Sequence, residues 1–294
     1  MQQPSATDHA NTVQNPKTRN VGSAQTQSVN LSGIRHDTCI NKKFSVVVYV
    51  FENYSMTIAS TSLNIINSNY IPTKINYLNN LFKRICVSFE HCRTVIIPNW
   101  EFGKWRNEAV DNSVYNNYST ENTINLYLVE TINFTKCQAD YGYMPDQPTA
   151  LNPKNMVVSQ LTAPPGPDLA HAFGHFFGLY HTHHEINGSP ASPPPPAVSG
   201  SIQIVSNEFV DGSNCNLYGD GICDTEADPA PANSTFNQNH IMCDYNGGLQ
   251  DGKGNFYTPP FDNFMSYYSC RCRYTQQQYN KMVETILTKR MYLH

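Results

Sequence analysis

Five of the ten histidines in this 294-residue chain fall in one segment, DLAHAFGHFFGLYHTHH. His171 and His175 are four residues apart, so a helix would place both imidazoles on one face, where they can hold one ion. Gly178 can end such a helix in a left-handed conformation, and the turn that follows would bring His181 under the same ion. Three neutral imidazoles with an open fourth position are the ligand set of a catalytic zinc site.

The last two histidines of the segment are the nearest alternative ligands. Their offset from His175 does not fit a chain that turns at Gly178, so we interpret His183 and His184 as residues at the rim of the site. A second alternative is an amphipathic helix whose histidines face solvent and bind no metal. The three-histidine spacing, with glycine at the hinge, favours the metal site.

Strand and helix patterns before the histidines predict helices packed on a sheet. The segment KKFSVVVYVF, residues 42–51, is β-branched and aromatic, which predicts a buried strand. Residues 72–89 carry apolar side chains at helical spacing and predict a helix that backs the sheet. Further strands are predicted at residues 93–100 and 122–131. This order of elements indicates an α+β fold.

The N-terminal segment and the region after the histidines differ from the middle of the chain in residue composition. Residues 1–42 are polar and patternless, which predicts a disordered leader or propeptide. After His184, four consecutive prolines exclude a helix or an inner strand. Residues 206–273 are rich in Gly, Asp, Asn and Cys and predict an irregular lobe. The chain closes on a predicted helix that begins with a capping box of Thr275 and Gln278.

Composition limits the class of protein. The formal net charge of −4 gives no electrostatic case for binding nucleic acid. The longest apolar run, residues 44–51, is too short for a membrane span, which needs about 20 residues. Nine cysteines without a CxxC pair favour disulfides in an oxidising compartment, and therefore secretion, although the first forty residues show no signal peptide.

The histidine motif and the segments behind it resemble the metzincin metallopeptidases, and within them the pappalysin family. The resemblance extends from about residue 40 to the C-terminus and rests on segments that occur in the family's order. These segments are GHFFGLYHT, VDGSNCNLYGDGICDTEADP and NFMSYYSC.

The resemblance implies a catalytic domain over residues 43–294. Its upper lobe, about residues 43–178, would hold a twisted mixed sheet, a backing helix and the active-site helix. The lower lobe, about residues 179–294, would be irregular, with disulfides and the C-terminal helix. A protein or peptide substrate would lie in the cleft between them, and the sequence leaves the oligomeric state open.

The resemblance also assigns roles to residues outside the zinc motif. Met265 matches the Met-turn residue beneath the zinc, and Tyr267 matches a tyrosine that stabilises the tetrahedral intermediate, with Tyr268 as its neighbour and alternative. The loop before the Met-turn supplies hard oxygen donors that suit calcium, which relatives bind in this lobe. The candidate calcium ligands are Asp220, Asp224, Thr225 and Asp228.

Disulfides are expected in both lobes. The resemblance implies that the lower lobe is stapled by Cys215, Cys223, Cys243 and Cys270, in a connectivity that the sequence does not fix. Cys86 and Cys92 are candidates to pair across the end of the backing helix. Cys39 either caps the zinc from the leader or pairs with Cys137 or Cys272.

Ala172 breaks the family pattern. In active members, a glutamate after the first histidine takes a proton from zinc-activated water and later delivers it to the leaving amine; Ala172 can do neither. Glutamate is not a zinc ligand, so the metal would still bind, while the loss of general acid–base catalysis raises the barrier by about 3–5 kcal/mol. Glu185 lies beyond His181, and we do not expect it to substitute.

The sequence therefore predicts a secreted zinc metalloendopeptidase whose general base is missing from this chain. Ala172 is either an engineered change or the mark of a natural pseudoprotease that binds peptides without turnover. An adhesion domain stabilised by calcium and disulfides, with incidental histidines, is a third alternative.

Overall fold

A computed structural model of the chain describes residues 39–51, 69–97, 104–105, 108–132, 140–145, 155–161, 163–183, 208–229 and 250–294. The predicted leader up to residue 38, the proline-rich segment, His184 and Glu185 lie outside them. None of the helices in the described ranges is long and apolar enough to cross a bilayer.

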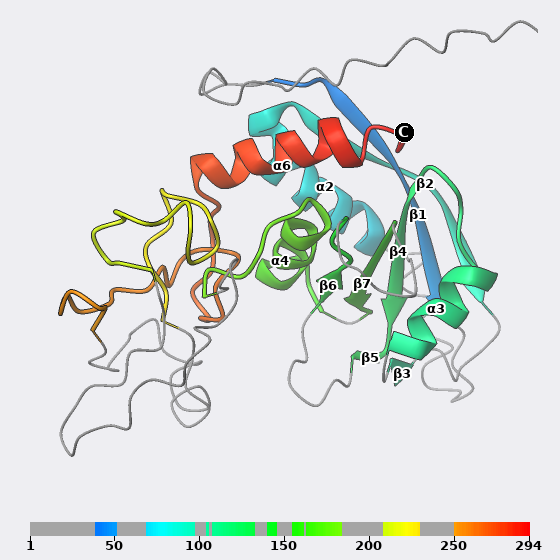
Figure 1. Ribbon diagram of the computed structural model, residues 1–294. Helices are drawn as coiled ribbons and strands as arrows, with labels where there is room; N and C mark the ends of the chain where they lie inside the picture. The colour runs from blue at the N-terminus through cyan, green and yellow to red at the C-terminus, as the bar shows by residue number, and fades with distance from the viewer. Residues whose placement is uncertain are drawn as a thin grey trace, which may run out of the picture. The chain divides into compact units, whose positions relative to one another are not determined.

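Figure 1 shows the strands and helices of the described residues. The strands are β1 (Lys42–Phe51), β2 (Val87–Ile97), β3 (Lys104–Trp105), β4 (Ile124–Val129), β5 (Thr131–Ile132), β6 (Tyr141–Gly142) and β7 (Met156–Gln160). The helices are α2 (Tyr70–Phe82), a 3-10 turn at Lys83–Ile85, α3 (Glu108–Asn117), α4 (Pro167–Phe176) and α6 (Gln276–Lys289).

The main sheet has five strands in the order β2-β1-β4-β7-β6. The pairs β1–β2, β1–β4 and β4–β7 are parallel, and only the short edge strand β6 is antiparallel to its neighbour. The mixed sheet, its backing helices and the C-terminal helix confirm the predicted α+β fold.

Each face of the sheet is covered by its own apolar cluster, because alternate residues of a strand point to opposite faces. From β1, Val46 and Val48 join the cluster that contains α2, α4 and α6, whereas Val47 and Tyr49 join the cluster that contains Val114 of α3. The helix that carries the histidines therefore packs on the same face as the backing helix and the C-terminal helix (Figure 1).

The backing helix predicted at residues 72–89 is shorter in the structure, and its last predicted residues belong to strand β2. It ends at Phe82, is followed by the 3-10 turn, and the chain reverses at Cys86, whose φ is +55°. From Val87 to Glu90 buried and exposed residues alternate, and Phe89 pairs with Phe44 of β1 in the parallel register. Ile85 and Phe89 fit a helical period, but together with Val87 they fit a strand period, and tertiary pairing selects the strand.

One disulfide differs from the expected pairings. Cys39 is bonded to Cys86, with a Cα–Cα distance of 4.8 Å across a sequence separation of 47 residues. Cys92 is a free, exposed thiol, so the Cys86–Cys92 pairing is wrong. The alternatives in which Cys39 caps the metal or pairs with Cys137 or Cys272 are wrong as well, since its sulfur is already bonded.

Of the four cysteines expected to staple the predicted lower lobe, Cys215 and Cys223 form a disulfide and Cys270 is also disulfide-bonded, whereas Cys243 lies outside the described residues.

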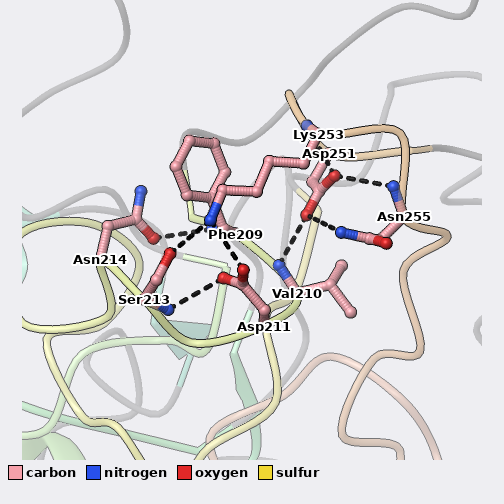
Figure 2. A network of polar contacts seen from close by, with 8 residues as sticks. All are labelled: Phe209, Val210, Asp211, Ser213, Asn214, Asp251, Lys253 and Asn255. Carbon is pink, nitrogen blue, oxygen red and sulfur yellow. Dashed lines mark hydrogen bonds and ion pairs between the residues drawn. The ribbon is translucent and has the colours of Figure 1, made fainter.

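Polar side-chain contacts connect residues 209–214 with residues 251–255, where the chain forms no helix (Figure 2). The carboxylate of Asp251 accepts hydrogen bonds from the backbone N–H groups of Val210 at 2.9 Å and of Asn255 at 2.8 Å. The ammonium of Lys253 contacts Asp211 at 2.7 Å and lies 4.4 Å from the centroid of the Phe209 ring. These contacts join the segment around residue 210 to the segment around residue 253.

Candidate metal centre

Helix α4 carries His171 and His175 and ends at Phe176, and the chain turns at Gly178. The N–H of Gly178 donates to the carbonyl of His175 at 2.8 Å, and the N–H of Leu179 donates to the carbonyl of Gly174 at 2.9 Å. This pair of bonds is a Schellman C-cap, which needs a left-handed residue at Gly178, and the φ of Gly178 is +89°. The chain then turns back and carries His181 under the helix.

The three imidazoles meet through their Nε2 atoms. The Nε2 of His175 lies 3.0 Å from that of His171 and 2.9 Å from that of His181, and the His171–His181 distance is 3.1 Å. In the part of the chain that the structure describes, these three histidines are the one group of potential metal ligands with all ligand atoms within 4.8 Å of one another. The sequence motif thus becomes a cluster in space.

The outer ring nitrogens fix which atoms face the centre. The Nδ1 of His171 lies 2.7 Å from the Phe264 carbonyl, and the Nδ1 of His175 lies 2.7 Å from the Leu179 carbonyl. A carbonyl oxygen can only accept, so both Nδ1 atoms carry the proton and a neutral ring presents a bare lone pair at Nε2. The Nδ1 of His181 lies 3.3 Å from the hydroxyl of Tyr267.

A cation fits this donor set. The Nε2 lone pairs of His171 and His175 face each other at 3.0 Å and repel one another, whereas a metal ion among the three Nε2 atoms would be coordinated by all three. Tetrahedral zinc with Zn–N distances of about 2.0–2.1 Å needs Nε2 atoms roughly 3.3 Å apart. The observed spacing of 2.9–3.1 Å has to open by only a few tenths of an ångström.

Burial and neighbouring charges keep the first ligand neutral. His171 is buried, and this burial holds the pKa of its imidazole well below the usual value of 6.5, with the charge of His175 acting in the same direction. A metal ligand must be deprotonated at the coordinating nitrogen, so the environment favours the form that binds metal.

Met265 lies directly beneath α4 and is fully buried. A Cβ at Gly174 would overlap its sulfur atom, so only glycine lets the helix approach this closely. The carbonyl of Met265 accepts from the N–H of Thr182 at 3.2 Å, and its neighbour Phe264 is the acceptor for His171. The turn at Met265 therefore supports both ends of the histidine segment.

Aromatic rings pack around the third histidine. The Tyr267 ring centroid lies 4.5 Å from that of His181 and 4.4 Å from that of His183. The rings of His181 and His183 stack at 5.0 Å with an interplanar angle of 11°. His183 is thus beside the centre but not part of the three-histidine group.

Position 172 has no proton-transferring group. Ala172 is fully buried, and a Cβ at Gly142 of β6 would overlap its carbonyl oxygen. Among the described residues, no carboxylate belongs to the group of three histidine ligand atoms.

The three candidate calcium-binding aspartates accept hydrogen bonds from donors in three different parts of the chain. Asp220 accepts from the N–H of Ile222 at 2.9 Å within its own loop, and Asp224 accepts from the N–H of Gln277 at 2.8 Å in the first turn of α6. Asp228 accepts from the hydroxyl of Thr182 at 2.5 Å. These carboxylates therefore do not form a metal-ligand group of the kind that the histidines form.

Two carboxylate oxygens in this loop stay without a donor. Within the described residues, one oxygen of Asp220 and one of Asp224 are buried and accept no hydrogen bond. Burial raises the pKa of Asp220 to about 7, and the charges of Asp228 and Asp224 act in the same direction. Burial also raises the pKa of Asp228 to about 7.

Several contacts around the three histidines could not be predicted from the sequence. The carbonyls of Phe264 and Leu179 hold the ring nitrogens, and any residue type can supply a backbone carbonyl. Thr182 and its acceptor Asp228 are separated by 46 residues, so their hydrogen bond is visible only in the fold.

The turn at Gly178 leads to a first prediction. Gly178→Ala is expected to lower the free energy of unfolding by about 1–3 kcal/mol, because a left-handed alanine is strained and its Cβ would lie 2.6 Å from the Thr285 hydroxyl. Urea unfolding measures this loss. A fully stable alanine variant would contradict the role of Gly178 in ending the helix.

The comparisons with known proteins agree with this architecture at the level of the fold. No protein-family profile matches the sequence, and no curated protein sequence matches it. The structure is similar to mature mirolysin of Tannerella forsythia in complex with a cleaved peptide, with a TM-score of 0.53, 16% identity, and coverage of 86% of this chain and 95% of that one. A structure of mirolysin with a compound gives a TM-score of 0.52, 15% identity, and coverage of 86% and 96%. The chain therefore has a fold similar to that of mirolysin.

Proposed function

We propose that this chain is a secreted metalloendopeptidase of the pappalysin type, with zinc held by His171, His175 and His181 and without the general base of an active enzyme. The observation that carries the proposal is the convergence of the three Nε2 atoms at 2.9–3.1 Å. The similarity of fold to mirolysin with a cleaved peptide supports a peptide as the molecule that binds.

In such a site, the metal ion and the surrounding residues would have different roles. A bound Zn²⁺ supplies Lewis acidity toward water and toward a peptide carbonyl. The Phe264 and Leu179 carbonyls hold two ligand rings in the orientation that coordination needs. Tyr267, whose hydroxyl now contacts His181, is the residue we assign to the developing oxyanion.

Ala172 removes the proton-transfer step from this scheme. Its methyl group can neither take a proton from water nor deliver one to the leaving amine. General acid–base catalysis contributes about 10²- to 10⁴-fold, so the chain is expected to bind peptides and to turn them over very slowly.

A natural pseudoprotease is the second candidate function. The observation that favours it is Ala172, which stands where the resemblance places the general base. The alternative is an engineered change in an otherwise intact site, which the retained ligands and Met265 favour. Both predict a zinc-dependent peptide-binding cleft.

Peptide retention tests this shared expectation. The zinc-loaded protein is immobilised, a mixed peptide library is passed over it, and retained peptides are counted by mass spectrometry. The His175→Ala variant serves as the matched control without a complete ligand set. Retention by the zinc-loaded protein alone supports the proposal, whereas equal retention by both proteins contradicts it.

The disulfides support an extracellular location. Cys39–Cys86 and Cys215–Cys223 are both formed, and such bonds persist in oxidising compartments. We assign the protein to the extracellular space on this basis.

We also propose a calcium ion at the buried Asp220 oxygen that accepts no hydrogen bond. Calcium takes six to eight oxygen ligands in flexible geometry, so water and backbone carbonyls can complete its coordination. Thr225 and Asp228, two other predicted ligands, are engaged with Asp220 and Thr182.

The raised pKa of Asp220 leads to a prediction about pH. Its folded-state pKa is about 7 against 3.8 ordinarily, so its contribution to stability is complete below about pH 4 and is lost as the pH rises through about 7. Chelator-treated protein should therefore lose stability over this range relative to Asp220→Asn, which does not titrate there. Urea unfolding at several pH values measures the difference between the two proteins.

Calcium should reverse this loss. The ion binds the ionised carboxylate, so millimolar calcium is expected to raise the unfolding midpoint of the chelator-treated protein above pH 7 and much less below pH 5. An unchanged midpoint above pH 7 would contradict the calcium proposal.

A further inference from the structure

The third ligand depends on its loop more than the other two do. His171 and His175 are built into α4, whose backbone fixes their spacing. His181 follows Gly178 in a segment without helix or strand. Bonds from the neighbouring residues must therefore hold the His181 imidazole under the helix.

Thr182 supplies those bonds. It is 1% exposed, its N–H donates to the Met265 carbonyl at 3.2 Å, and its hydroxyl donates to the Asp228 carboxylate at 2.5 Å. One residue thus ties the His181 backbone to the Met265 turn on one side and to the acidic loop on the other.

The acceptor of this bond is costly to bury. Asp228 is 3% exposed, and a buried carboxyl group is unfavourable unless hydrogen bonds compensate it. Its loop is fixed in turn, because Asp224 accepts from the N–H of Gln277 in α6. The segment from Asp224 to Asp228 therefore bridges the C-terminal helix and the third ligand.

We propose that Thr182 and Asp228 are positioning residues that hold His181 in the geometry needed for metal binding. The inference rests on the proposed zinc site and adds the acidic loop to it. Outer contacts of this kind typically change metal affinity about 10- to 100-fold.

Thr182→Val tests the bond, because valine keeps the shape of threonine and removes the hydroxyl. We expect its zinc affinity, measured by competition with a chromophoric chelator, to fall about tenfold. The visible spectrum of the cobalt-substituted protein should change as well, since it reports the ligand geometry. Thr182→Ser keeps a hydroxyl and should retain most of the affinity.

Thr123→Val is the matched control. It removes another buried threonine hydroxyl, which donates to the Thr120 carbonyl at 3.0 Å. A general loss of stability would affect both valine variants, but only Thr182→Val should alter zinc affinity and the cobalt spectrum.

The outcomes separate the two proposals. If the unaltered protein binds no zinc, the proposed function fails. If it binds zinc and Thr182→Val binds as tightly with the same cobalt spectrum, only the positioning role is overturned. Should Thr182→Val fail to fold, Asp228→Asn, which weakens the same bond, must lower the affinity in the same direction, and an unchanged affinity overturns the inference.

Discussion

Ala172→Glu is expected to raise the rate of peptide hydrolysis about 10²- to 10⁴-fold over the unaltered chain. The three ligands already converge, with Nε2 atoms 2.9–3.1 Å apart, and the Met265 turn is in place beneath them. The missing component is the group that moves the proton, and general acid–base catalysis contributes a factor of this size. The measurement is kcat/KM on a fluorogenic peptide selected from the retained library.

Ala172→Gln is the matched control for this gain. Glutamine has the size and polarity of glutamate but cannot act as a base at neutral pH, so its rate should stay near that of the unaltered chain. Equal rates for the glutamate and glutamine variants, with zinc bound to both, would mean that position 172 does not supply the base.

His175→Ala is expected to weaken zinc binding by roughly a thousandfold. Structural zinc in zinc-finger peptides contributes on the order of 10–16 kcal/mol, and on that scale losing one of three protein ligands costs several kcal/mol. His175 also has the shortest Nε2 contact in the cluster, 2.9 Å to His181. Competition with a chromophoric chelator gives the dissociation constant directly.

His183→Ala provides the comparison for that loss. His183 stacks on His181 at 5.0 Å but is not in the ligand group, so its removal should change zinc affinity less than tenfold. Losses of similar size in both alanine variants would make His183 a ligand and our assignment of the three-histidine set wrong.

The strands and caps that depend on neighbouring residues were predictable from the sequence. The β-branched run at residues 42–51 forms β1 with the predicted bounds. At the start of α6, both hydrogen bonds of the predicted capping box between Thr275 and Gln278 are present. These features follow from local side-chain chemistry, so a sequence contains most of the information.

Features that depend on tertiary contacts were not predictable. Helix α3 lacks a clear apolar period, and the short strand β7 has no distinct signal. The helix predicted to reach Phe89 ends earlier because Val87 and Phe89 pair with β1. The Cys39–Cys86 bond joins residues 47 positions apart, and no local pattern selects that partner.

The candidate site shows the same division. The spacing of His171, His175 and His181 is enough to indicate a shared ion, because helix geometry and a glycine turn determine where those side chains go. The calcium residues share a loop in the sequence, but their carboxylates bind Ile222, Gln277 and Thr182 in space. Proximity in sequence did not make them one group.

The zinc K-edge absorption spectrum of the zinc-loaded protein tests the assignment of the metal site most directly. We expect three imidazole nitrogens at about 2.0–2.1 Å, a further light atom, and no sulfur neighbour. A sulfur shell near 2.3 Å, fewer than three imidazoles, or no zinc retained after dialysis would contradict the assignment of His171, His175 and His181 as the metal site.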